Sequence, residues 1–255
     1  MGIKTSIVIP VCNQAGYSRI CLDYLVRTGG AEFELVVVDN GSTDGTGALF
    51  RSLKKPVNVS YIRNSRNLGP IIALNQGVKA ATGDIVCTMH NDLVVFEAGW
   101  LVKLARFISD RGEIGLVGIA GRRRIDRKGR VDEDSLLHNL QNENLNAPMS
   151  ADWGEAAVLD GVLIAGKKTV FENIGCFDEQ YGFMHYYDLD ISLRSRRAGY
   201  KNAVLKIESL HINNGGLTRK TPEYKRVVPD DTALLNRNSA LFFDKWKKYL
   251  PIEIS

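Results

Sequence analysis

Residues 33–42 read FELVVVDNGS, an apolar run that ends in an acid, an amide, a glycine and a serine. A continuous apolar run of this length is typical of a strand that is buried on both faces of a parallel sheet. Residues 5–11, TSIVIPV, have the same β-rich character, and apolar side chains recur at helical spacing over residues 17–25. The order strand, helix, strand predicts two parallel strands joined by a crossover helix.

The same alternation continues to residue 89. A second helix is expected at residues 49–53, a strand at 58–63 (NVSYIR), a third helix at 71–81 and a strand at 84–89 (DIVCTM). This order predicts an α/β protein whose mostly parallel, twisted sheet is flanked by helices. The residues after the first strand contain no Gly-x-Gly-x-x-Gly pattern, which argues against a dinucleotide-binding Rossmann domain.

The second half of the chain has a less regular pattern. Its expected elements are a helix at 101–108, a strand at 114–121 (IGLVGIAG), a strand at 157–166 (AVLDGVLIAG), a helix at 188–201, a strand at 203–207 (AVLKI) and an amphipathic helix from Asn236 to Tyr249. The polar stretch from Arg122 to Asp152 predicts a long loop, which in a compact domain is usually functional or mobile.

Composition argues against several classes of protein. The net charge of +4 on 255 residues is too weak to indicate a nucleic-acid partner. No apolar run approaches the roughly 18 residues that a membrane-spanning helix needs. The four cysteines contain no Cys-x-x-Cys pair, which favours reduced thiols. We therefore expect a cytoplasmic protein, with the inner face of a membrane included among its locations.

Polar side chains follow three of the predicted parallel strands. The first strand runs into Asn13, the second ends in Asp39, and the fourth is followed by residues 90–92 (HND). Ligands of an open parallel sheet bind beyond the carboxyl ends of its strands, so this convergence predicts a nucleotide-sized ligand there. Taken singly, Asp39 is also a good helix cap and Asp92 an ordinary turn acid.

Asp188 and Asp190 open a predicted helix, where the exposed amide groups favour negative charge. Two interpretations stay open for these acids: a catalytic carboxylate, or simple compensation of the helix dipole with Arg194 as a surface partner. The basic run GRRRIDRKGR at residues 121–130 is either a solvated loop or a site for an acidic acceptor.

Five segments, in order, resemble family 2 of the inverting glycosyltransferases, which have the GT-A fold. Residues 6–25 are similar to the family's opening strand with Pro and Asn, and residues 34–46 to its Asp-Asp-Gly-Ser-Thr-Asp signature. Residues 67–92 are similar to its Asn-Leu-Gly helix leading to the D-x-D strand. Residues 160–201 are similar to its acceptor-side block ending in Glu-Asp-x-Asp and Gly-Tyr, and residues 210–218 to its later His-containing segment.

The resemblance implies one GT-A domain over residues 1–255, with a nucleotide-sugar-binding half at 1–92 and an acceptor-binding half at 93–255 that includes the C-terminal helix. Asp39 falls on the residue that holds the nucleobase. The full set implied to bind the nucleotide sugar is Pro10, Asn13, Asp39, Asn67, Gly69, Asn75 and Asn91.

The resemblance also implies a metal site and a general base. Asp92 matches the metal-binding last acid of D-x-D, and His211 a residue that completes the site for Mn²⁺ or Mg²⁺. Asp188 matches the general base, and the acceptor-side candidates are Gly161, Tyr187, Asp190 and Arg194. The sequence departs from the family at His90 and Asn91, where an acid is usual, and at Tyr187, where Glu is usual. The second departure leaves Asp190 open as an alternative base.

The implied reaction transfers a sugar from a nucleotide diphosphate sugar to a hydroxyl of a carbohydrate, a lipid-linked glycan or a protein, with inversion. Two other functions stay open. A sugar nucleotidyltransferase should carry a Gly-rich, basic loop after the first strand, and this chain lacks one; a non-catalytic nucleotide-sugar-binding protein is compatible with the altered D-x-D. The basic segment 242–250 (FFDKWKKYL) leaves peripheral membrane association open, although a helix packed on the domain is favoured.

Overall fold

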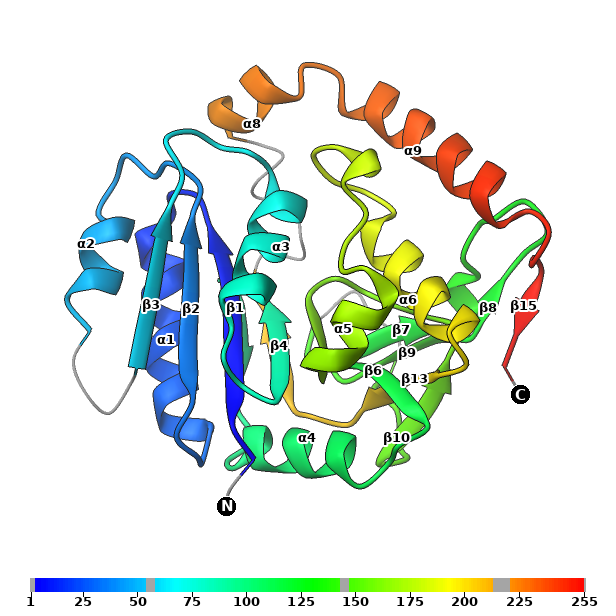
Figure 1. Cartoon of the computed structure of the whole chain (residues 1–255), viewed down its shortest axis with the longest axis horizontal. Coiled ribbons are helices and arrows are strands. Elements are labelled where there is room, and N and C mark those ends of the chain that lie inside the picture. The colour runs from blue at the N-terminus through cyan, green and yellow to red at the C-terminus, as the bar shows by residue number, and fades with distance from the viewer. Residues whose placement is uncertain (1–2, 54–57, 143–146, 213–220, 255) are drawn as a thin grey trace.

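The computed structural model describes residues 3–53, 58–142, 147–212 and 221–254. An eight-stranded sheet forms its centre, in the order β10-β13-β6-β12-β4-β1-β2-β3 (Figure 1). These strands are β1 (Thr5–Val11), β2 (Glu34–Asp39), β3 (Asn58–Arg63), β4 (Ile85–Met89), β6 (Ile114–Gly118), β10 (Trp153–Ala156), β12 (Leu163–Lys167) and β13 (Lys201–Leu205).

Most neighbouring strands of this sheet are parallel. β1 pairs in parallel with both β2 and β4, and β13 pairs in parallel with β6. β12 runs antiparallel to β4 and β6, and β10 runs antiparallel to β13. The predicted α/β class with a mostly parallel sheet is confirmed.

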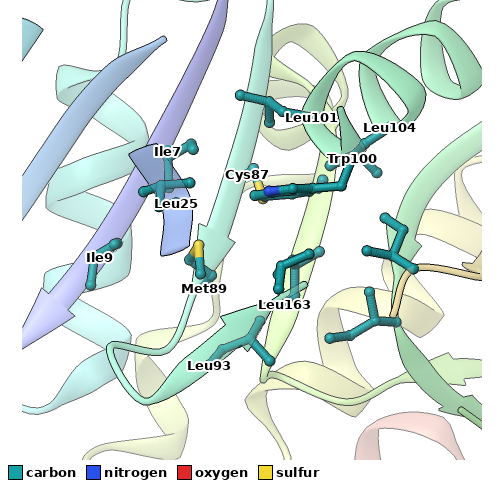
Figure 2. Close-up of a cluster of buried hydrophobic side chains, with 14 of the residues drawn as sticks. Ile7, Ile9, Leu25, Cys87, Met89, Leu93, Trp100, Leu101, Leu104 and Leu163 are labelled. Carbon is teal, nitrogen blue, oxygen red and sulfur yellow. The ribbon is translucent and has the colours of Figure 1, made fainter. Parts of the chain in front are cut away.

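Helices cover both faces of the sheet. α1 (Ala15–Thr28), α2 (Thr46–Arg51) and α4 (Trp100–Ser109) pack on one face, in a core cluster that contains Ile7 and Ile9 of β1 (Figure 2). α3 (Pro70–Ala80), α5 (Lys168–Ile174) and α6 (Tyr187–Arg197) pack on the other, in a cluster that contains Val8. Successive residues of β1 therefore face opposite layers, as the pleat of a strand requires.

Two strands predicted as continuous are divided in the structure. The run 114–121 forms β6 and then β7 (Ala120–Arg122), and the run 157–166 forms β11 (Val158–Leu159) and then β12. β11, β7 and a further strand, β9 (Leu136–His138), make a separate three-stranded sheet. The break in the second run falls at Asp160 and Gly161, which interrupt its apolar residues.

The predicted long loop at 122–152 is partly ordered, so that prediction was wrong in part. It contains β8 (Arg124–Ile125), a 3-10 turn at Glu133–Ser135 and β9, while residues 143–146 lie outside the described residues. β8 pairs with β15 (Ile252–Glu253) near the end of the chain. A strand of two residues with so distant a partner leaves no periodic signal in the sequence.

The last two described helices are α8 (Pro222–Val227) and α9 (Asp231–Trp246), which lie at the top of Figure 1. α9 begins before the predicted Asn236, because the Asp230 side chain accepts a hydrogen bond from the Ala233 amide, 2.9 Å away, and caps the helix. Its Phe242 and Trp246 are buried against the domain. Within the described residues, no helix combines the length and the apolar character needed to cross a membrane.

The close packing of α3 on β1 predicts a stability effect at Gly77. A Cβ atom there would overlap Cγ1 of Val8, so we expect Gly77→Ala to lower the free energy of unfolding by about 1–3 kcal/mol. Gly16, near the start of α1, has no atom within 4 Å of such a Cβ, and Gly16→Ala should cost nothing. Urea denaturation of both variants measures the difference, and equal stability of the two would contradict the packing argument.

Candidate active site

A pocket opens at the carboxyl ends of β1 and β4. Its lining includes Pro10, Asn40 and Asn67 from the first half of the chain, together with residues 90–92. It also includes Phe183, Met184 and Tyr187 from the segment that leads into α6. Of the residues implied to bind the nucleotide sugar, the pocket brings together Pro10, Asn67 and Asn91.

Three potential metal ligands lie close together, and two of them, His90 and Asp92, line this pocket. His211 Nε2 lies 3.0 Å from Asp92 Oδ1 and 3.4 Å from His90 Nδ1, and one ligand atom from each residue lies within 4.8 Å of the other two. His211 reaches this place because β14 (Ser209–His211) pairs with β5 (Leu93–Val95), which follows Asp92. Asp92 and His211 were predicted from the sequence. His90 was missed, although it stands at the first position of the D-x-D spacing.

The chemistry of this cluster suits a divalent transition-metal ion. Burial and the neighbouring His211 ring lower the pKa of His90 to about 4, although Asp92 opposes this. His90 is therefore neutral near pH 7, and a neutral imidazole keeps a lone pair for a metal. Imidazole nitrogens together with a carboxylate oxygen form a donor set that fits Mn²⁺ better than Mg²⁺, which prefers oxygen ligands only.

Asp39 lies behind the pocket wall. Its side chain is fully buried; Oδ1 accepts from the Ser42 amide at 2.7 Å, and Oδ2 accepts from Arg63 Nη1 at 2.7 Å and from the Tyr61 hydroxyl. Burial alone raises the pKa of this carboxyl, but the hydrogen bonds and the Arg63 charge together hold it below its ordinary value. These contacts fix the turn after β2, and Asp39 is not among the residues that line the pocket.

Asn40, the next residue, lines the pocket instead. Its Nδ2 donates to the Gly69 carbonyl at 3.0 Å, and its Oδ1 accepts from Asn64 Nδ2 at 2.8 Å. The sequence analysis missed Asn40, although it stands at the second acid of the family's Asp-Asp pair. Its amide joins the end of β2 to the start of α3, where Gly69 adopts a φ of 90°.

Several residues implied to bind the donor make hydrogen bonds to neighbouring parts of the chain. Asn13 Oδ1 accepts from the Thr43 amide at 2.8 Å, which braces the turn after β2. Asn67 Oδ1 accepts from the Gly69 amide at 3.0 Å. Asn91 Nδ2 donates to Ser18 Oγ at 2.9 Å. Asn75 lies away from the pocket wall and bonds the Phe177 backbone through both its side-chain atoms, at 2.9 Å each.

Asp188 lies in the first turn of α6, next to the pocket residue Tyr187. Its Oδ2 accepts from the Gly161 amide at 2.9 Å and its Oδ1 from the Leu189 amide at 3.0 Å. Burial, and then the negative charge of Asp160, raise the pKa of Asp188 to about 6. A Cβ atom on Gly161 would lie 2.5 Å from the Tyr187 hydroxyl, so only glycine fits there.

Asp190 and Arg194 point into the core rather than into the pocket. The fully buried Asp190 accepts from Tyr181 Oη at 3.1 Å and Trp246 Nε1 at 2.9 Å, and it pairs with Arg194 Nε and Lys245 Nζ at 2.8 Å each. Arg194 also donates to two backbone carbonyls, those of Ile174 and Cys176. Of the two acids left open as the base, the geometry favours Asp188.

Half of the six basic residues in the run at 121–130 pair with neighbouring acids. Arg122 pairs with Asp160 and Glu133, at 2.5 and 2.7 Å. Further along, Arg124 pairs with Asp132 and Arg130 with Asp126.

A pocket beyond the strand ends of an α/β sheet is where such folds bind nucleotide-sized ligands. Residues 6–175 match the model of Glycosyl transferase family 2. The chain belongs to this family, an inverting family of glycosyl-transfer enzymes with the GT-A fold.

Individual relatives agree with this assignment. The chain is 25% identical, over 257 residues, to a PGL/p-HBAD biosynthesis glycosyltransferase of Mycobacterium bovis, and the match covers 96% of this chain and 91% of that protein. The mannosyltransferase PcManGT from Pyrobaculum calidifontis, solved with GDP-Man and Mn²⁺, superposes with a TM-score of 0.63 at 17% identity, covering 98% of this chain and 76% of that one. GalNAc-T7, solved with UDP, GalNAc and Mn²⁺, gives 0.64 at 17% identity, covering 89% and 48%.

The buried Asp190 cluster predicts a large stability effect. Asp190→Asn leaves the charge of Arg194 without its carboxylate, whereas Lys245 keeps Asp178 as a partner. We therefore expect the free energy of unfolding to fall by about 3 kcal/mol or more. If Asp190 stabilised the protein only through the dipole of α6, its replacement would lower the free energy of unfolding by only about 0.3–1 kcal/mol. Trp246→Phe, which removes one donor and keeps an aromatic ring, should cost about 1 kcal/mol. Denaturant titration decides, and a loss below 1 kcal/mol for Asp190→Asn would show that the cluster contributes little.

Proposed function

We propose that this glycosyltransferase uses a divalent metal ion and the general base Asp188 to move a sugar onto an acceptor hydroxyl. The observation that carries the proposal is the placement of two different groups around one pocket. His90 and Asp92 of the candidate metal cluster line the pocket, and so does Tyr187, which directly precedes Asp188 in the first turn of α6. A leaving diphosphate and an acceptor need such groups on opposite sides of the transferred sugar.

His90, Asp92 and His211 would hold the ion. When bound, it supplies positive charge that offsets the negative charge of the departing diphosphate. The solved relatives PcManGT and GalNAc-T7 contain Mn²⁺ with a nucleotide or nucleotide sugar, which supports Mn²⁺ as the ion used here. Asn40, Asn67 and Asn91 line the adjoining wall and offer amide groups to the nucleotide.

Asp188 acts on the acceptor. Its carboxylate takes the proton from the acceptor hydroxyl while the hydroxyl oxygen forms a bond to the anomeric carbon. The bond from that carbon to the diphosphate breaks, and the nucleoside diphosphate leaves with the bonding electrons. One displacement inverts the anomeric centre. The Gly161 and Leu189 amides hold the carboxylate in place during this step.

The acceptor itself is a carbohydrate, a lipid-linked glycan or a protein, and it enters past the wall that carries residues 183–187. The mycobacterial relative is named for PGL/p-HBAD biosynthesis, which supports including PGL and p-HBAD precursors in the panel of acceptors to test. Leu235, Phe243 and Tyr249 of the C-terminal region are exposed. These apolar side chains would make a peripheral contact with a membrane. The buried Phe242 and Trp246 show that α9 is packed on the domain through its other face.

The metal proposal predicts the behaviour of Asp92→Ala. Wild-type protein should gain thermal stability from UDP or GDP when Mn²⁺ is added, because a ligand that binds the native state stabilises it by mass action. Asp92→Ala should lose the Mn²⁺-dependent part of this gain. Mg²⁺ should give a smaller gain than Mn²⁺ in wild type, since two of the three ligands are imidazoles.

Asp110→Ala is the matched control, because Asp110 is an exposed acid at the end of α4. Its Tm should respond to nucleotide and Mn²⁺ as wild type does. An Asp92→Ala protein that keeps the full Mn²⁺ response would rule out this ligand set.

The base proposal predicts the behaviour of Asp188→Asn. General-base catalysis contributes roughly 10²–10⁴-fold, so turnover should fall by that order while donor affinity stays near wild type. In wild type, turnover should decline as pH falls through about 6, where Asp188 becomes protonated. Transfer rates over a panel of donors and acceptors, with donor binding followed by Tm, provide the measurement. Unchanged turnover in Asp188→Asn would end the base assignment.

A further inference from the structure

A turn formed by Asp160 and Gly161 contacts the proposed base from one side and an arginine from the other. We propose that Asp160 and Arg122 are positioning residues that set the pH range in which Asp188 works as a base. This inference rests on the proposed function of Asp188. The Arg122–Asp160 ion pair lies outside the residues proposed to contact the donor or the metal.

The turn is fixed at both of its residues. The Asp160 amide donates to the Ala120 carbonyl at 3.0 Å, which ties the turn to β7. The Gly161 amide donates to Asp188 Oδ2 at 2.9 Å, which ties it to α6. The Asp160 carboxylate is therefore one residue away from a direct contact with the base.

Arg122 holds the Asp160 carboxylate. Arg122 lies on β7, and its Nη1 is 2.5 Å from Asp160 Oδ1, while Nε and Nη2 contact Glu133 Oε2 at 3.1 and 2.7 Å. The Arg122 side chain is 15% exposed, whereas Glu133 is 69% exposed. An exposed partner is strongly screened by water, so Asp160 is the electrostatically important partner of this guanidinium.

The two charges act on Asp188 in opposite directions. A like charge favours the protonated form of a carboxyl, and Asp160 is the charged group with the largest effect on Asp188. Arg122 offsets part of that negative charge. Tyr187 is a neutral phenol beside the base, because burial raises its pKa. The groups of the candidate metal cluster are not among the causes of this shift, and the charges of Asp190 and Arg194 are paired within the core.

A purely structural role for the pair makes a different prediction. If Arg122 and Asp160 only anchored the turn between β11 and β12, then removing either would lower stability without a characteristic change in the titration of Asp188. The signature of the proposed role is a pair of opposite shifts. Neutralising Asp160 should move the titration midpoint of Asp188 to lower pH, and neutralising Arg122 should move it to higher pH.

The experiment follows the Asp188 carboxyl directly by ¹³C NMR of the full chain labelled with carboxyl-¹³C aspartate. The resonance is assigned by its absence in Asp188→Asn, so no substrate is needed. We expect the midpoint to fall by about 0.5–1 pH unit in Asp160→Asn and to rise by a similar amount in Arg122→Gln. Glu133→Gln is the matched control and should leave the midpoint within about 0.2 unit of wild type.

Shifts in the same direction for Asp160→Asn and Arg122→Gln, or no shift in either, would overturn the proposal. If Arg122→Gln does not fold, Arg122→Lys keeps the charge and should shift the midpoint less than Asp160→Asn does, which still decides the matter. Failure of the base role is a separate result: Asp188→Asn would then retain transfer activity, whatever its neighbours do to its titration.

Discussion

β2 is buried along its full length, from Glu34 to Asp39, and so is β4; β1, which lies between them, is buried except at Pro10. A strand covered on both faces can carry polar side chains only where they find partners inside the protein. This constraint favours polar groups at the carboxyl ends of the strands, where the loops leave the sheet. The pocket, the amides that line it, and His90 and Asp92 of the candidate metal cluster all occur at those ends.

The pleat of β2 decides which face of the sheet each of its polar residues lies on. Leu35 and Val37 of β2 belong to the core cluster beneath α1, and Val36 belongs to the cluster beneath α3. Asp39 continues the first set, which explains why it meets Tyr61 and lies away from the pocket. Asn40 turns toward α3 and reaches Gly69. Because alternate residues of a strand face opposite sides of the sheet, the sequence pattern of β2 predicts that Asp39 and Asn40 face different layers. The family signature drew attention to Asp39 only.

The sequence predicted the first half of the fold well because each element there is long and periodic. It also predicted that Asp92 and His211 lie together, through the resemblance to the family. It could not predict the division of the strand around Asp160, since apolar residues continue on both sides of the break. Nor could it predict the pairing of β8 with β15, which depends on contacts between distant segments.

The C-terminal helix holds the pocket wall in an unusual backbone conformation. His185 and Tyr186, which precede the base, have φ values of 70° and 65°, a region that costs about 1–3 kcal/mol for residues other than glycine. The fully buried Asn238 of α9 donates to the Tyr181 and Met184 carbonyls, at 2.7 Å each, and stabilises the segment that contains them. Asp190 makes a second connection to the same helix through Trp246.

The position of Asp188 couples acidity to the stability of the whole protein. Folding raises the pKa of this carboxyl from about 4, its value in an unfolded chain, to about 6. Between these two values the native state binds more protons than the unfolded state, so the contribution of Asp188 to stability is largest below pH 4 and is lost as the pH rises to 6. The difference is worth up to about 3 kcal/mol. Above pH 6, where Asp188 is a carboxylate that can accept a proton, this group alone therefore lowers the free energy of unfolding by this amount relative to its value below pH 4.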